Sequence, residues 1–187
     1  MRHLIYAINL TLDGCCDHTK GGIPDDELYD YYIRLVQDAG AFVYGRKTYQ
    51  LMVPFWPDFA KNPPDKSGAG YKYAQAFVAV NKMIVISRTL DNAEGQNIEI
   101  IRSNLKDEIL KLKQQPGKPL LTGGVDIPSQ LIQLGLVDEY CILIHPIVAG
   151  DGRRLMEGIS LQEKLQLKLL ETKTFKSGAV LLRYSKE

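Results

Sequence analysis

The sequence is poor in cysteine, in long apolar runs and in excess charge of either sign. Its three cysteines, Cys15, Cys16 and Cys141, show neither the CxxC spacing of a redox motif nor the paired spacing of a zinc site. The apolar run at residues 4–8 is too short to cross a membrane or to form a signal-peptide core. With 23 Lys and Arg against 22 Asp and Glu, the net charge of +1 gives no bulk attraction to nucleic acid. These absences favour a cytoplasmic protein with reduced thiols, no metal site, no membrane or nucleic-acid partner, and a small-molecule ligand.

The remaining composition fits a single domain spanning residues 1–187. Hydrophobic side chains make up 45% and charged ones 24% of the chain, which is enough for a sizeable core. Short apolar segments alternate with helical patterns over most of the sequence, whereas residues 139–148, 165–175 and 179–184 are predicted strands without helices between them. We therefore predict an α/β fold in three layers, with a mixed, mostly parallel sheet, antiparallel C-terminal strands and helices on both faces.

The first candidate binding segment is Gly45-Arg46-Lys47-Thr48, which follows a short apolar strand. A helix that begins at such a strand end offers free amides and a positive dipole to a phosphate, and Arg46 and Thr48 could add a cation and a hydroxyl. An ordinary helix start with solvated Arg46 and Lys47 is the alternative. The same helix is expected to stop at Pro54, with residues 55–70 forming a surface loop.

Two further strand ends carry similar signals. Thr122-Gly123-Gly124-Val125-Asp126 again joins a strand to a helix start, and its two glycines let the backbone approach a ligand, although an ordinary tight turn is the alternative. Ser87-Arg88-Thr89 places two hydroxyls around a guanidinium, a pattern that can hold a phosphate monoester or simply end a strand. The ordered set of three segments, more than any one of them, favours a phosphate-binding site.

Together with other motifs, these segments resemble the dihydrofolate-reductase-like superfamily. They are most like the C-terminal reductase domain of the bifunctional riboflavin-biosynthesis deaminase-reductases, here in a stand-alone form, and the resemblance covers nearly the whole chain. Its marks are Asn9-Leu10-Thr11-Leu12-Asp13-Gly14, Gly45-Arg46-Lys47-Thr48-Tyr49, Ser87-Arg88-Thr89-Leu90, Gly123-Gly124, Leu136-Val137-Asp138-Glu139 and His145-Pro146-Ile147-Val148-Ala149-Gly150-Asp151-Gly152.

This resemblance implies a dihydrofolate-reductase-like fold and an NADPH site. The residues expected at the pyrophosphate are Gly45, Arg46, Lys47, Thr48, Gly123, Gly124, Val125 and Asp126. Those expected near the adenosine 2′-phosphate are Ser87, Arg88 and Thr89, helped by Arg46, and those at the nicotinamide are Ala7, Asn9 and Leu10. The implied activity is NADPH-dependent hydride transfer to a pterin-like or ribosylaminopyrimidine-like molecule, as in 5-amino-6-(5-phosphoribosylamino)uracil reductases. The resemblance also implies a homodimer that pairs through the C-terminal strands.

The substrate side departs from the family pattern. Dihydrofolate reductases hold the pteridine with a carboxylate on the first helix, but the corresponding position falls near Leu28 and Tyr29, neither of which is acidic. Their substrate-side threonine is replaced by an apolar residue around Ile142. The fused zinc deaminase of the riboflavin enzymes has no counterpart, because the chain lacks its His/Cys ligand set. These departures argue against dihydrofolate and leave the cofactor site intact.

Asp13 is the candidate catalytic residue, as a polar substrate contact or a member of a proton relay. A turn-forming Asp-Gly pair is the alternative interpretation, and the lone His145 is more often structural than catalytic. Aromatic side chains could line the pocket of a planar substrate or serve ordinary packing: Tyr29, Tyr31, Tyr32, Phe55 and Trp56.

Two functions of different classes follow from these patterns. The leading hypothesis is a hydride-transfer oxidoreductase, which needs no nucleophile because the cofactor supplies the chemistry. The alternative is a catalytically silent NADPH-binding sensor or scaffold, which the changed substrate side favours. A flavodoxin-like or Rossmann protein fits less well, because the antiparallel C-terminal strands do not belong to a doubly wound sheet.

Overall fold

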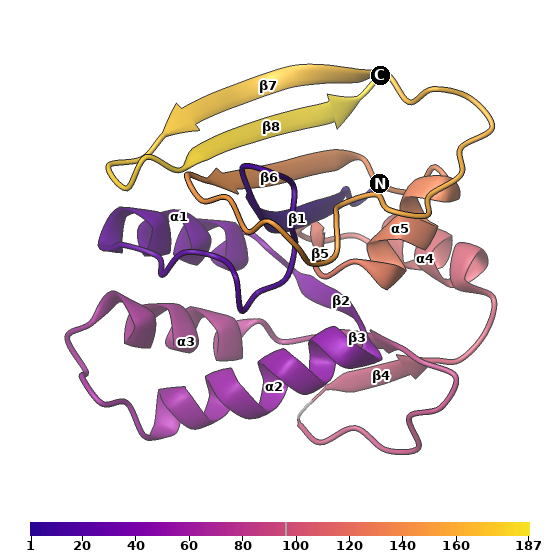
Figure 1. Ribbon diagram of the computed structural model, residues 1–187. Coiled ribbons are helices and arrows are strands. Elements are labelled where there is room, and N and C mark those ends of the chain that lie inside the picture. The colour runs from indigo at the N-terminus through magenta and orange to yellow at the C-terminus, as the bar shows by residue number, and fades with distance from the viewer. Residues whose placement is uncertain (96) are drawn as a thin grey trace.

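Eight strands form one sheet through the middle of the computed structural model, which describes residues 1–95 and 97–187 (Figure 1). The strands are β1 (Leu4–Thr11), β2 (Ala41–Gly45), β3 (Met83–Ile86), β4 (Ile98–Ile101), β5 (Leu120–Thr122), β6 (Glu139–His145), β7 (Leu167–Thr174) and β8 (Val180–Lys186). Their order across the sheet is β4-β3-β2-β5-β1-β6-β8-β7. The strands from β4 to β6 pair in parallel, whereas β8 pairs antiparallel with both β6 and β7. The predicted mixed sheet with antiparallel C-terminal strands is therefore confirmed.

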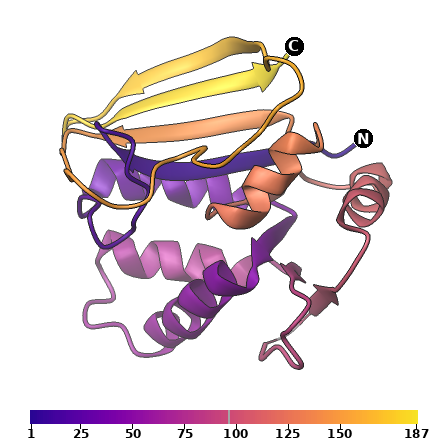
Figure 2. The same ribbon diagram turned by 45° about the vertical axis from the view of Figure 1, so that its right-hand side comes forward.

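Five helices in the described residues cover both faces of this sheet. They are α1 (Asp26–Gln37), α2 (Arg46–Lys61), α3 (Ala69–Ala79), α4 (Leu105–Gln114) and α5 (Asp126–Gln133). Because side chains alternate along a strand, Ile5 packs with α1 and α3, whereas Leu4 and Tyr6 pack in a second cluster with α4 and α5. Figure 2 shows α4 well away from α1, α2 and α3. This arrangement confirms the predicted helices on both faces.

The start of α1 is specified locally by its sequence. The side chain of Asp25 accepts a hydrogen bond from the backbone N–H of Leu28 at 2.9 Å, and Asp26 and Glu27 place negative charge in the first turn, where the helix dipole favours it. Leu28 and Val36 then bury one face of the helix against the sheet. The capping arrangement fixes where α1 begins and so which of its residues face the sheet.

Helix α2 differs from the prediction, because it does not stop at Pro54 but continues through Pro54 and Pro57 to Lys61. A proline inside a helix removes one backbone hydrogen bond and crowds the carbonyl four residues earlier. For Pro54 that carbonyl belongs to Gln50, an exposed residue that water can reach. Aromatic packing in the second half of α2 offsets the cost of the prolines. The ring centroids of Trp56 and Tyr73 lie 4.6 Å apart, and this contact joins α2 to α3. The predicted loop at residues 55–70 is correspondingly wrong for its first part.

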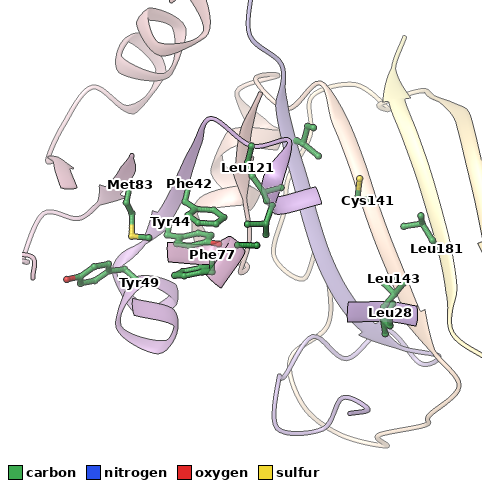
Figure 3. Close-up of a cluster of buried hydrophobic side chains, with 14 of the residues drawn as sticks. Leu28, Phe42, Tyr44, Tyr49, Phe77, Met83, Leu121, Cys141, Leu143 and Leu181 are labelled. Carbon is green, nitrogen blue, oxygen red and sulfur yellow. The ribbon is translucent and has the colours of Figure 1, made fainter. Parts of the chain in front are cut away.

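A stack of aromatic rings anchors β2 where it leads into α2. The ring centroid of Phe42 lies 4.7 Å from that of Phe77 on α3 and 5.1 Å from that of Tyr44, and Figure 3 shows the three rings lying over one another. Phe42 and Phe77 are almost fully buried, and truncating such a residue to alanine typically costs about 3–5 kcal/mol. Rigid packing therefore sets the position at which β2 ends and Arg46 begins the helix.

Candidate functional site

A cleft of about 1090 Å³ opens at the carboxyl ends of the parallel strands, where open α/β sheets commonly bind ligands. Residues of β1, β2, β3, β5 and β6 line it, together with side chains from α1, α2 and α3. Every residue assigned to the cofactor site lies in this lining: Ala7, Asn9, Leu10, Gly45, Arg46, Lys47, Thr48, Ser87, Arg88, Thr89, Gly123, Gly124, Val125 and Asp126. The fold thus brings the three strand-end segments together with the end of β1 around one space.

The first segment delivers the start of α2 to the cleft. Gly45 is the N-cap of α2, and no side chain caps the first turn, so its backbone N–H groups can bind an anion. A Cβ added at Gly45 would lie only 2.8 Å from Ile127 Cγ1 on α5. Only glycine fits here, because α2 and α5 start close together at this end of the sheet.

The Gly123-Gly124 turn approaches α2 from the other side. Gly124 has φ +84°, and a Cβ there would collide with Thr48 Oγ1. The hydroxyl of Tyr6 donates to the Gly124 carbonyl at 2.8 Å, and the buried Thr122 hydroxyl donates to the Val43 carbonyl at 2.7 Å. These two side-chain hydrogen bonds fix the position of the turn and of the strand before it. The turn itself has no side chain beside Thr48, so its backbone is accessible there.

Ser87 organises the third segment. Its Oγ accepts hydrogen bonds from the backbone N–H groups of Thr89 at 3.2 Å and Leu90 at 3.0 Å, which closes a tight turn after β3. Ser87 is buried, whereas Arg88 and Thr89 are exposed at the rim of the cleft. The turn therefore presents a guanidinium and a hydroxyl together.

The end of β1 forms the floor between these segments and α1. Asn9 Oδ1 accepts a hydrogen bond from the Tyr32 hydroxyl at 2.6 Å. Because the Asn9 oxygen has this partner, its amide nitrogen is oriented as a donor toward other groups. Ala7 and Leu10 line the cleft beside it, which gives this region one polar group on an otherwise apolar floor.

The side of the cleft formed by α1, α2 and α3 is aromatic. Its aromatic lining residues are Tyr29, Tyr31, Tyr32, Trp56 and Tyr73, which we call the aromatic wall. Tyr73 was missed by the sequence reasoning, since nothing in its helical spacing distinguishes a cleft residue from a packing residue. Phe55, by contrast, is exposed and is not part of the cleft lining.

Two further residues at the cleft had no functional assignment. His145 is buried at the end of β6, and desolvation holds its pKa below the usual value, so its imidazole is neutral at pH 7. Arg153 pairs with Asp126 at 2.6 Å, which brings a cation to the start of α5. The only sequence signal for Arg153 is its place directly after the His145-to-Gly152 motif.

Asp13 lies outside the cleft lining. Its carboxylate accepts hydrogen bonds from Thr11 Oγ1 at 2.5 Å and from the backbone N–H groups of Ala149 and Gly150 at 3.0 Å each, and it pairs with Arg154 at 2.7 Å. These donors hold the pKa of Asp13 far below its usual range. The geometry therefore favours the turn-forming interpretation of Asp13 over a catalytic one.

The described residues contain no group of three or more His, Cys, Asp or Glu side chains placed to hold a metal ion. Cys15, Cys16 and Cys141 are all free thiols. No helix in residues 1–95 and 97–187 is long and apolar enough to span a membrane.

Comparison with known proteins identifies the family of this chain and relatives of its fold. Residues 2–181 match the family described as the RibD C-terminal domain. The uncharacterised protein YyaP of Bacillus subtilis (strain 168) is 33% identical over 190 residues, which cover 98% of this chain and 94% of YyaP.

Two solved structures show the same fold. A protein assigned to riboflavin biosynthesis from Shewanella sp. PV-4 superposes with a TM-score of 0.74 at 18% identity, covering 99% of both chains. Dihydrofolate reductase from Enterococcus faecalis, solved with NADP(H), superposes with a TM-score of 0.65 at 13% identity, covering 99% of this chain and 96% of that one. The predicted dihydrofolate-reductase-like fold is confirmed.

Proposed function

The chain belongs to the RibD C-terminal domain family, and from this premise we propose that it is an NADPH-dependent oxidoreductase. In the proposed reaction a hydride passes to a pterin-like or ribosylaminopyrimidine-like small molecule. The observation that carries the proposal is the meeting of three strand-end segments with two arginines, Arg46 and Arg88, in one cleft. When bound, the reduced nicotinamide would supply the hydride and its two electrons.

The residues of the cleft fit such a cofactor. The uncapped start of α2 and the glycine surface beside Thr48 suit a pyrophosphate, which needs backbone amides at close range. The Ser87 turn offers Arg88 and Thr89 to a phosphate monoester. The oriented amide of Asn9 is a donor for a carboxamide oxygen at the end of β1.

The chain's own contribution to turnover would be positioning and exclusion of water. The aromatic wall and the apolar floor leave few groups that retain water beside the reacting ring, and desolvation strengthens the remaining polar contacts. A neutral His145 has one ring nitrogen that can accept a proton and one N–H that can donate, so it could relay a proton from water to the ring. No covalent intermediate with the protein is required.

The preference for NADPH over NADH tests the proposal. Arg88→Ala and Arg46→Ala should each lower NADPH affinity about tenfold or more, because a hydrogen bond to a charged group contributes about 1.5–3 kcal/mol. The affinity for NADH should hardly change, because NADH lacks the 2′-phosphate. Calorimetric titration of each variant with both cofactors measures this.

The matched control is Arg34→Ala on α1, since Arg34 is exposed and outside the cleft lining. It should leave both affinities unchanged. Equal losses for NADPH and NADH in the Arg88 and Arg46 variants would contradict a role in reading the 2′-phosphate. Tight NADPH binding without oxidation by any acceptor would favour the silent sensor instead.

We also propose that the protein acts in the cytoplasm. Three free thiols, two of them buried, suit a reducing compartment in which NADPH is available. A homodimer formed through the C-terminal strands belongs to the same proposal.

A further inference from the structure

The charged side chains of the cleft are segregated from its aromatic wall. The charged lining residues, apart from histidines, are Asp17, Arg46, Lys47, Arg88, Asp126 and Arg153. They come from the loop after β1, the starts of α2 and α5, the end of β3 and the loop after β6. The lining contributed by α1, α3 and the part of α2 beyond Thr48 contains no Asp, Glu, Lys or Arg. The half of the cleft that these helices line, which carries the aromatic wall, therefore receives no formal charge from its own side chains.

The aromatic wall is a packed unit with a fixed shape. The Tyr73 ring centroid lies 4.6 Å from that of Trp56, 6.1 Å from that of Tyr29 and 6.2 Å from that of Tyr32. Most of these pairs meet edge to face, which is a favourable arrangement for aromatic rings. Such a wall offers flat surfaces for a planar ligand to pack against.

The tyrosine hydroxyls of the wall do not supply charge either. Burial raises the pKa values of Tyr29, Tyr32 and Tyr73 above that of an ordinary tyrosine, so all three remain neutral at physiological pH. These tyrosines therefore add no charge to the wall.

None of the three acidic residues at the start of α1 lines the cleft, and two of them are engaged elsewhere. Asp25 caps the helix, and Glu27 pairs with Lys173 at 3.2 Å while accepting the backbone N–H of Lys176. Neither residue lines the cleft. The site thus has no carboxylate on α1 to hold a protonated ring and no cation on the wall to hold a phosphate or a carboxylate tail.

We propose that this half of the cleft binds an uncharged planar ring with a conjugated C=N or C=O bond and without a phosphate or carboxylate tail, such as a simple dihydropterin or a quinone. The proposal rests on the proposed function for the hydride donor. The ring gains a hydride, with its two electrons, from the nicotinamide and a proton from solvent, so that the reduced ring and the oxidised nicotinamide are the products. The wall helices offer no charged side chain to pair with a phosphoribosyl group or a folate glutamate tail, so burying either tail against the aromatic wall would leave its charge without a partner there.

A cationic ring is the other ligand that aromatic side chains attract. The remaining charges of the cleft oppose it, because the cations Arg46, Lys47, Arg88 and Arg153 outnumber the carboxylates Asp17 and Asp126. Preferential binding of a cationic ring is therefore the outcome that would contradict the proposal.

The chain contains a single tryptophan, Trp56, and it stands in the aromatic wall. Quenching of its fluorescence reports ligand binding directly, without turnover, in the free protein and in the presence of saturating NADP⁺. Free N-acetyltryptophanamide measured alongside corrects for light absorbed by the ligand. The two members of each probe pair share a ring system, and the second member carries a charged group that the first lacks: 1,4-naphthoquinone against its 2-sulfonate, 6-methyl-7,8-dihydropterin against 7,8-dihydrofolate, and quinoline against 1-methylquinolinium.

We expect saturable quenching by the neutral member of each pair and at least tenfold weaker binding of the charged member. A charged probe that binds as tightly as its neutral partner would overturn the proposal. Absence of saturable quenching by every neutral probe would overturn it as well.

A substitution in the wall localises the binding. Tyr73→Leu should weaken the neutral probes at least tenfold, whereas Tyr73→Phe, which keeps the ring, should retain most of the affinity. Tyr71→Leu is the matched control, because Tyr71 lies on the same helix outside the cleft lining. If Tyr73→Leu unfolds the protein, Tyr29→Leu takes its place. Unchanged affinity in a folded wall variant would contradict the assignment.

Calorimetric titration with NADPH separates this proposal from the proposed function. NADPH binding together with failure of all neutral probes would refute the substrate class alone. Saturable quenching together with failure of NADPH to bind would refute the proposed function and leave the ring site standing.

Discussion

At the scale of single residues, two glycines determine how closely the walls of the cleft approach. Gly45 leaves room for Ile127, and Gly124 leaves room for Thr48. The sequence marked both positions, because a glycine at a strand end signals close backbone approach. It did not mark Tyr73 or Arg153, whose roles depend on neighbours brought together only by the fold.

Gly124→Ala should lower both the stability of the protein and its affinity for NADPH. The new Cβ would collide with Thr48 Oγ1, and the residue would also have to keep φ at +84°. The positive φ alone costs a non-glycine residue about 1–2 kcal/mol. Urea unfolding and calorimetric titration measure the two effects.

Gly158→Ala is the matched control for the backbone cost. Gly158 has φ +75° and nothing within 4 Å of an added Cβ. The loss at Gly124 should exceed that at Gly158, and combining Gly124→Ala with Thr48→Ala should recover part of the stability. Equal losses at the two glycines would show that the contact with Thr48 has no effect.

At the scale of elements, the loops that follow β1 and β6 fasten to each other. β1 and β6 are parallel neighbours, so both loops leave the sheet at the same edge. The Leu12 backbone N–H donates to the Ile147 carbonyl at 2.7 Å, Asp13 pairs with Arg154, and Cys15 forms a β-bridge with Arg154. We call these contacts between the two loops the loop joint. Asp13 is a positioning residue in it, because the two loops carry Cys16 and Arg153 to the cleft.

From the contacts of Asp13 in the loop joint we predict that Asp13→Asn lowers the stability of the protein by an amount that depends on pH. The folded protein holds the pKa of Asp13 below 3.8, so the carboxylate stabilises the fold at any pH above that value and loses its effect as the pH falls further. The stability difference between the parent and Asp13→Asn should therefore be constant from pH 7 to about pH 5 and should shrink below about pH 4. Urea unfolding midpoints across this range measure it.

Asp30→Asn serves as the control, because Asp30 is exposed on α1 and belongs to neither loop. It should show little stability difference at neutral pH. A difference for Asp13→Asn that stays constant down to pH 3 would mean that the charge of Asp13 does not hold the loops together.

Element boundaries were predictable where local chemistry decides them and not where distant packing does. The cap at Asp25 and the acidic first turn of α1 are local signals, and both lie where the helix begins. The two prolines of α2 are local signals as well, but the contact between Trp56 and Tyr73 lies outside any local window and outweighs them. The same limit applies to the aromatic wall, which three separate helices assemble.

At the scale of the whole molecule, the outer strand β7 is an exposed edge of the sheet (Figure 1). Nearly all of its residues are at least partly exposed, including Leu169 and Leu170. The pairing of β7 with β8 shifts register between Leu169 and Glu171. An exposed strand edge with apolar side chains favours pairing with another chain.

We expect the protein to be a homodimer in which β7 contributes to the interface. Light scattering should give about twice the mass of the 21.0 kDa chain. Leu170→Lys should shift the protein toward the monomer, because a charged side chain on an edge strand opposes pairing. Leu161→Lys is the control at another exposed leucine outside the strands. A parent protein that remains monomeric at all concentrations would contradict the expectation.

The central place of β1 also determines when the molecule can be completed during its synthesis. Leu4 pairs with Leu120, and Ile5 pairs with Glu139, so the first strand to leave the ribosome has neighbours that begin only at residues 120 and 139. Translation at about 5–20 residues per second leaves β1 unpaired for several seconds. Contacts between such distant segments also slow folding, because a long loop must close first. The floor of the cleft is therefore among the last parts to form, and a nascent chain that ends before β6 lacks one of the two strands that pair with β1.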